Sequence, residues 1–249
     1  IAALQFELGK VERKEIRQRV VVLLGNVDEG LAKEVAEKIG VGTPPPAPPP
    51  FQPMPGGVAL APSLSIDRMP RTSIATRKIA VLAADGFSGK QLGAVRAALE
   101  AGGATIDVIA PKLGIVKAAD GDDVEAGQNY LTAASVLYDA VYVPGGKASI
   151  DTMTLQGYGI NFVKEAFRHA KPVGATGEGV DFLVAAGIAT APAPGGGGAS
   201  VGGAGGLVSD RGVVTSRSGS NMSAFADELA AAIKQHRHWD RDEDETLPF

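Results

Sequence analysis

Residues 175–179 have the outline of a nucleophile elbow, the sharp turn that exposes a reactive side chain between a strand and a helix. They read Ala-Thr-Gly-Glu-Gly, with small residues on both sides of the central position. In a complete elbow the central side chain attacks the substrate, and nearby backbone N–H groups stabilise the oxyanion that forms. The central residue here is Gly177, which has no side chain. The sequence therefore predicts the scaffold of a covalent catalyst without its nucleophile.

Other groups near the predicted elbow do not replace the nucleophile. Thr176 is one position away, and the alternation of side chains along a strand directs it the other way. Glu178 stands at a predicted helix start, where the dipole stabilises its anion, so we interpret it as a helix-terminal carboxylate rather than a general acid or base. The pair Gly145-Gly146 could supply the N–H groups of an oxyanion hole, although glycines after strands more often form plain turns. The degenerate pocket comprises Gly177, Glu178, Ser88, Gly145 and Gly146.

The histidines do not predict a metal site, and no cofactor site is predicted for this chain. His169 lies at a predicted helix end, where a cation suits the helix dipole. His236 and His238 precede an acidic run, but on a charged tail we favour solvated side chains over metal ligands. The turn Asp85-Gly86 lacks the Ser/Thr-rich phosphate loop that a flavin would need. We therefore assign no catalytic, cofactor-binding or metal-binding residue.

Composition excludes several classes of function. The 249 residues include no cysteine, which removes disulfides, thiolate metal sites and a cysteine nucleophile but leaves the cellular compartment open. A net charge of −4 gives no sign of a nucleic-acid partner, and no run approaches the ~20 apolar residues of a membrane helix. The chain starts with Ile1 and an opening segment too charged for a signal peptide, so we expect it to begin within a longer protein.

The elements that must position the elbow lie in residues 77–238, where predicted strands alternate with predicted helices. The strands are expected within residues 78–84, 105–110, 139–146, 172–179 and 213–216, and the helices around residues 92–99, 162–169 and 222–233. Such alternation predicts βαβ units and a mostly parallel sheet. We predict an α/β, flavodoxin-like, doubly wound domain, in which ligands bind at the carboxyl ends of the strands.

A short helical segment and a proline-rich linker precede this domain. Residues 1–42 contain two predicted helices, although the run from Val20 is equally compatible with a strand. Asn26 and Glu29 resemble a capping pair for the second helix, and Gly40 would end it. Residues 43–76 are predicted to form an extended linker because positions 43–70 hold ten of the 16 prolines.

Two further segments are predicted to lie outside the packed layers. Residues 195–206 contain eight glycines in twelve positions. No strand precedes this run and no helix follows it, so we expect a flexible surface loop rather than a phosphate cradle. Residues 239–249 are predicted to form a charged tail.

Residues 171–183, KPVGATGEGVDFL, are similar to the elbow of PfpI-type proteins in the class I glutamine amidotransferase-like group. In that group a Lys-Pro-Val strand leads into a cysteine, a histidine and a glycine. On this sequence the family cysteine falls on Gly177 and its histidine on Glu178. The family's acidic residue after an Asp-Gly-Phe turn falls on Ser88. The resemblance therefore implies the fold but not the protease, hydrolase or glyoxalase activity.

A second resemblance, to large-subunit catalases, covers nearly the whole chain. It rests on residues 6–40, the proline-rich linker, RKIAVLAADGFSG (77–89) and KQHRHWDR (234–241), in the same order as in that family. The family architecture is a haem catalase core followed by a linker and a flavodoxin-like domain. The haem ligands of the family lie in the core, upstream of Ile1. The resemblance thus implies haem and peroxide decomposition for the full-length parent, and no cofactor in this fragment.

Three hypotheses for function follow. The first is a non-catalytic module that stabilises subunits, with the catalase core and neighbouring subunits of a homotetramer as partners; when isolated, it would shield unfolding client proteins as a chaperone. The second is a PfpI-type hydrolase or glyoxalase with an atypical nucleophile: Thr176, Ser88 or Ser149. The third is a small-ligand-binding or gating domain at the strand ends. None of them involves nucleic acid or a membrane.

Overall fold

The chain forms two compact units, Ile1–Arg68 and Met69–Phe249. The computed structural model describes residues 1–42, 71–188 and 206–241. Most of the predicted linker, the glycine-rich segment up to residue 205 and the tail beyond residue 241 lie outside the described residues. No helix within the three described ranges has the length and apolar composition needed to cross a bilayer.

The first unit consists of three helices: α1 (Ala2–Gly9), α2 (Lys14–Gly25) and α3 (Glu29–Lys38). The run from Val20 is therefore helical, and its strand alternative is wrong. The predicted capping pair is also wrong, because the side chain of Asp28 caps α3 by accepting from the Leu31 N–H at 2.7 Å. Gly40 ends α3 as predicted, with a φ of +68° that glycine adopts readily.

The first unit has a small core and several exposed apolar side chains. The buried residues are Leu8, Val21, Ala32, Val35, Ala36, Ile39 and Val41. Phe6, Leu23 and Val27 are each more than 60% exposed. Short helices depend on packing for most of their stability, so these exposed side chains are candidates for contacts with another surface.

A seven-stranded sheet organises the second unit. Its order is β10-β11-β9-β8-β1-β3-β7, and every neighbouring pair is parallel except β10 and β11. The strands are β1 (Lys78–Leu82), β3 (Thr105–Ala110), β7 (Gln128–Asn129), β8 (Ala140–Val143), β9 (Val173–Thr176), β10 (Leu207–Asp210) and β11 (Val213–Ser216). Numbered by their order along the chain, the five longer parallel strands run 2-1-3-4-5 across the sheet, which is the flavodoxin order. The predicted fold class is confirmed.

Short strands lie at the carboxyl edge of this sheet. They are the two-stranded pairs β2 (Phe87–Ser88) with β5 (Ala118–Asp120) and β4 (Gly114–Val116) with β6 (Val124–Ala126). Two 3₁₀ turns, η3 (Ser135–Leu137) before β8 and η4 (Trp239–Arg241) after α8, lie elsewhere in the second unit. These short pieces were not predicted, because two or three residues carry too little periodicity to reveal a strand.

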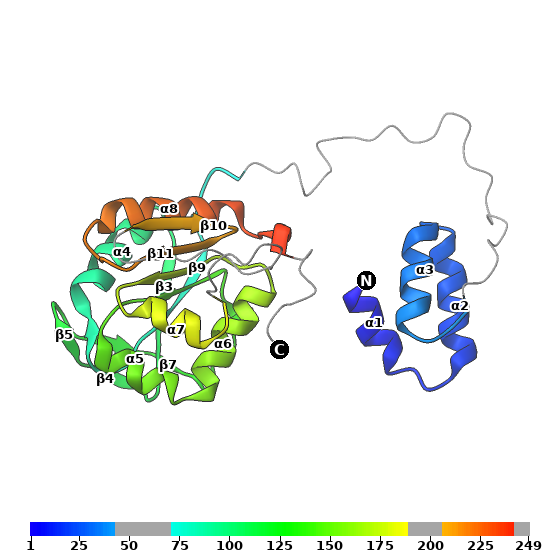
Figure 1. Cartoon of the computed structure of the whole chain (residues 1–249), viewed down its shortest axis with the longest axis horizontal. Helices are drawn as coiled ribbons and strands as arrows, with labels where there is room; N and C mark the ends of the chain where they lie inside the picture. The colour runs from blue at the N-terminus through cyan, green and yellow to red at the C-terminus, as the bar shows by residue number, and fades with distance from the viewer. Residues whose placement is uncertain (43–70, 189–205, 242–249) are drawn as a thin grey trace. The chain divides into compact units, whose positions relative to one another are not determined.

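Helices cover both faces of the sheet (Figure 1). On one face lie α4 (Gly89–Ala101) and α8 (Met222–Gln235), and on the other lie α5 (Lys147–Thr154), α6 (Gly157–Arg168) and α7 (Gly179–Ala185). The alternation along β8 explains why its residues are all buried. Val141 and Val143 enter the core under α5, α6 and α7, whereas Ala140 and Tyr142 enter the core under α4 and α8.

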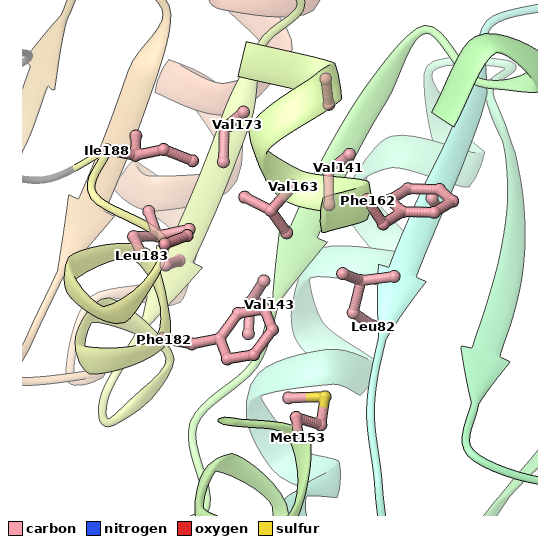
Figure 2. Close-up of a cluster of buried hydrophobic side chains, with 14 of the residues drawn as sticks. Leu82, Val141, Val143, Met153, Phe162, Val163, Val173, Phe182, Leu183 and Ile188 are labelled. Atoms are coloured by element: carbon pink, nitrogen blue, oxygen red, sulfur yellow. The ribbon is translucent and has the colours of Figure 1, made fainter. Parts of the chain in front are cut away.

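Figure 2 shows the core on the α5–α7 side, where Phe182 and Leu183 of α7 meet Val143 and Val173 of the sheet. Met153 of α5 closes this core at one end and is completely buried. Burying each such large apolar side chain contributes roughly 1.5–3 kcal/mol to the free energy of unfolding. This core fixes the strand ends from which the candidate site is built.

The end of the described chain is packed rather than solvated. His238 and Arg241 are 4% and 2% exposed, which corrects the interpretation of His238 as a solvated tail residue. The Arg241 guanidinium donates to the carbonyl oxygens of Arg211, Phe167 and Lys171 at 2.6, 3.2 and 2.9 Å. Sequence reasoning missed this because charged side chains are rarely buried unless paired.

Candidate functional site

The bend between β9 and α7 lies at Gly177. β9 ends at Thr176, α7 begins at Gly179, and Gly177 has a φ of +54°. The Gly177 N–H donates to the carbonyl oxygen of Ser216 at 2.9 Å, which holds the bend against the end of β11. The structure thus has the left-handed backbone of a sharp turn at Gly177, a residue that adopts this conformation at little cost and offers no nucleophile.

The side chain of Gln91, from the first turn of α4, fills the space beside the bend. Its Oε1 accepts hydrogen bonds from Thr176 Oγ1 at 2.6 Å and from the Gly145 N–H at 2.9 Å. A Cβ placed on Gly177 would lie 3.2 Å from Gln91 Nε2, and one placed on Gly219 would collide with the same amide. Three glycines therefore surround the Gln91 amide closely.

Glu178 binds the Gly146 N–H, one of the two backbone donors that an oxyanion hole at Gly145-Gly146 would use. Its Oε2 accepts from the Gly146 N–H at 2.8 Å, while the Gly145 N–H donates to Gln91. A catalytic oxyanion hole needs donors aimed at the position of the developing charge. Here Gly145 and Gly146 already donate to side chains of the same chain, and the carboxylate of Glu178 would repel an incoming anion.

Thr176 lies in a neutral, fully buried network. Its Oγ1 is 2.8 Å from the hydroxyl of Tyr142, which is also fully buried. Burial raises the pKa of Tyr142 well above its ordinary value, so this phenol stays protonated and cannot act as a base. Thr176 therefore has hydrogen-bond partners but no group that could take its proton.

The other two hydroxyls weighed as nucleophiles serve structural roles. Ser88 is the N-cap of α4: its Oγ accepts from the Gln91 N–H at 3.4 Å and donates to Asp120 Oδ1 at 2.9 Å. Ser149 is fully buried, and its Oγ accepts from the Ala84 N–H at 2.9 Å. The carboxylate that contacts Ser88 thus comes from Asp120, 32 residues later in the chain.

The three histidines are engaged elsewhere. His169 lies 3.4 Å from Glu165 on α6, and His236 lies 3.4 Å from Asp139. The Nε2 atom of His238 lies 3.2 Å from the carbonyl oxygen of Ala232. Burial is the main cause that lowers the pKa of both His236 and His238. Within residues 1–42, 71–188 and 206–241, no group of three or more His, Cys, Asp and Glu side chains could hold a metal ion.

The tyrosines of the second unit do not fit a haem ligand. Tyr130 OH contacts Met153 Sδ at 2.9 Å, Tyr138 OH contacts Asp107 Oδ2 at 3.1 Å, and Tyr142 OH contacts Thr176. All three rings are buried. Tyr158 is exposed and borders a hollow of about 240 Å³, which is far too small to enclose a haem group.

Gln91 is the site residue that sequence reasoning missed. In the sequence it is one polar residue near the start of a predicted helix, with nothing to distinguish it from a surface glutamine. Its position beside the bend depends on where α4 begins, and the N–H of the N-cap residue Ser88 holds that point by donating to the carbonyl oxygen of Gly145 at 2.7 Å. The only available signal was the cluster of glycines at 145, 177 and 219, which leaves room for a side chain from elsewhere.

The proteins that this chain resembles are catalases. Residues 75–243 match the family described as the C-terminal domain found in long catalases, and residues 1–39 match the family described as catalase-related immune-responsive. Catalase HPII of Mycobacterium avium is 39% identical over 97% of this chain and 33% of the relative. Catalase-2 of Bacillus subtilis is 37% identical over 97% of this chain and 31% of the relative.

A fungal relative, Catalase-1 of Neurospora crassa, is 32% identical over 98% of this chain and 33% of its own length. The chain thus spans about a third of the length of these curated relatives. The matched family range includes every strand of the seven-stranded sheet and the bend at Gly177. The chain belongs to the family of C-terminal domains found in long catalases.

Proposed function

We propose that this chain is a non-catalytic module that stabilises the subunits of a long catalase. The observation that carries the proposal is the bend itself. Gly177 supplies no nucleophile, and the side chains of Gln91 and Glu178 take the hydrogen bonds that a reacting oxyanion would need. The hydroxyls of Thr176, Ser88 and Ser149 have no histidine among their hydrogen-bond partners. A PfpI-type hydrolase therefore has little support in this geometry.

In this proposal the full-length parent contains haem and decomposes hydrogen peroxide. The catalase names of the relatives and the one-third share of their length support this assignment. The partners of the module would be the catalase core and neighbouring subunits of a homotetramer. The parent's haem would be held by residues of that core; in this chain the hydroxyls of Tyr130, Tyr138 and Tyr142 already contact other groups of the second unit.

Exposed apolar side chains support a role in subunit contacts. In the second unit, five large apolar residues of the segments 131–137 and 155–158 are each at least 60% exposed: Leu131, Val136, Leu137, Leu155 and Tyr158. The first unit adds Phe6, Leu23 and Val27. Exposed apolar side chains that gather in short segments are typical of protein–protein contact sites.

The test compares the full-length parent with a version lacking residues 69–249. We expect the shortened protein to keep its haem absorption band and its peroxide turnover per haem, and to inactivate at a lower temperature. Loss of turnover with full haem content would contradict a non-catalytic role. Equal thermal inactivation of the two proteins would contradict the stabilising role.

The exposed apolar segments also favour a second function, that of a chaperone when the module is isolated. The chain would bind apolar segments that unfolding proteins expose. Heating a thermolabile enzyme with the 249-residue chain should suppress its aggregation, whereas a variant with Leu155→Ser and Tyr158→Ser should suppress it less. Aggregation equal to that with an inert protein would refute the chaperone function and leave the stabilising role intact.

A further inference from the structure

A hollow of about 230 Å³ lies at the carboxyl ends of β1 and β3, away from the bend at Gly177. Its apolar lining consists of Ala84, Ala110, Pro111 and Val116. Two of these are alanines that follow or end the strands, so short side chains leave the space open. Carboxyl strand ends are where ligands bind in open α/β sheets.

Hydrogen bonds fix the walls of this hollow. The Gly86 N–H donates to the carbonyl oxygen of Lys117 at 2.7 Å, and the Lys117 N–H donates to Asp85 Oδ1 at 2.8 Å. The Ala83 N–H donates to the carbonyl oxygen of Ile109 at 3.1 Å, which holds the two strand ends together. A site held in this way is preformed, so a ligand would lose little affinity to ordering the protein.

Three polar groups border the apolar lining. Asp85 and Lys112 carry opposite charges, and Thr152 of α5 supplies a hydroxyl. Asp85 Oδ2 and Lys112 Nζ are 3.7 Å apart, and both side chains are more than half exposed. Such an exposed pair gains little from its own attraction and opens easily. Lys117, the next cation along the chain, pairs with Asp123 at 2.7 Å.

We propose that this hollow binds a small zwitterion, an α-amino acid with a short aliphatic side chain. Its ammonium group would take the place of Lys112 beside Asp85. Its carboxylate would accept from Lys112 and from the Thr152 hydroxyl, and its side chain would enter the lining of Ala84, Ala110 and Val116. A ligand with only one charge would leave either Asp85 or Lys112 without its partner.

The test is a titration of the isotope-labelled 249-residue chain with L-valine, followed by the NMR signals of the Ala84 and Thr152 amides. We expect saturable shifts with L-valine. Isobutylamine and isovalerate, which are valine without its carboxylate and without its ammonium group, should each bind at least about tenfold more weakly, because each lacks one charge-assisted hydrogen bond. Shifts that never saturate, or equal affinity for all three compounds, would overturn the proposal.

Variants separate the site from general effects of charge. Asp85→Asn keeps the Oδ1 that accepts from the Lys117 N–H, and Lys112→Met keeps an apolar stem; each should weaken L-valine binding about tenfold. Lys147→Met removes a cation from the first turn of α5, where it pairs with Asp151 at 2.8 Å, and should leave binding unchanged. Equal loss in Lys147→Met and Lys112→Met would show a long-range charge effect and refute the assigned contacts. The proposal does not depend on the subunit-stabilising function.

Discussion

Two corners at the carboxyl edge of one sheet are built in opposite ways. At the bend after β9, the Gln91 amide and the Glu178 carboxylate take the hydrogen bonds of the Gly145 and Gly146 N–H groups. At the ends of β1 and β3, short side chains leave a hollow of about 230 Å³ bordered by a loose ion pair. The corner at the Gly177 bend, where a nucleophile elbow would carry its reactive side chain, is thus filled, and space remains at a neighbouring corner.

The comparison teaches that a missing nucleophile is not the same as an empty site. A glycine at the bend alone would leave two unbonded N–H groups facing a gap. Here a side chain from another helix fills that gap and satisfies one of the donors. The filled corner at Gln91 should therefore contribute to stability. Substitutions there should lower the free energy of unfolding far more than substitutions at the open corner beside Asp85 and Lys112.

The largest effect should come from Gly146→Ala. Gly146 has a φ of +118°, and a Cβ there would collide with the backbone of Gly86 and Phe87. We expect the free energy of unfolding to fall by roughly 3 kcal/mol, because backbone strain and overpacking add. Urea denaturation gives the value. Gly93→Ala on the exposed face of α4, where a Cβ meets nothing within 4 Å, is the control and should not destabilise the chain.

Next in size is Gln91→Ala, which empties the filled corner. It leaves the Gly145 N–H without its acceptor and removes one partner of Thr176. Loss of these bonds should lower the free energy of unfolding by about 2 kcal/mol. Arg96→Ala, at a half-exposed position of the same helix that pairs with Glu100, should change it by no more than about 0.5 kcal/mol. Equal changes in the free energy of unfolding for the two variants would show that the hydrogen bonds of Gln91 do not stabilise the fold.

Thr176→Val should lower the free energy of unfolding by about 1 kcal/mol, because the buried hydroxyl of Tyr142 loses its hydrogen-bond partner. The double variant Thr176→Val with Tyr142→Phe removes both hydroxyls and should cost less than the two single variants added together. Urea denaturation of the four proteins measures this coupling. Strict additivity would indicate that the two hydroxyls do not interact.

The smallest effect should come from Lys112→Met at the open corner. The ion pair with Asp85 is long and exposed, so the free energy of unfolding should change by less than about 0.5 kcal/mol. Urea denaturation of this variant and of the unchanged chain measures the difference. A loss comparable to that of Gln91→Ala would mean that the two corners do not differ in the way described.

The sequence predicted the fold and the position of the bend, for physical reasons that are local. The apolar strand run within residues 78–84 and the helix stripe of Leu92, Val95 and Leu99 are local patterns, and the structure confirms both. The small residues around Gly177 likewise predict a sharp turn from the local sequence alone, and the positive φ of Gly177 confirms it.

What the sequence could not predict depends on contacts between distant segments. Gln91 meets Thr176 across 85 positions of the chain, and Arg241 meets Phe167 across 74. No local pattern distinguishes either residue from a solvated side chain. The hollow at Ala84 and Ala110 is equally nonlocal, since it exists only where two strand ends and α5 converge.

The most direct test of the filled corner uses the absence of cysteine from this chain. Gly177→Cys places a single thiol at the bend, and a helix start lowers the pKa of such a thiol, so an accessible Cys would react quickly with iodoacetamide. We predict that this variant reacts much more slowly than Gly93→Cys on the exposed face of α4, and that adding Gln91→Ala accelerates the reaction. A rate for Gly177→Cys equal to or above that of Gly93→Cys, unchanged by Gln91→Ala, would contradict the account.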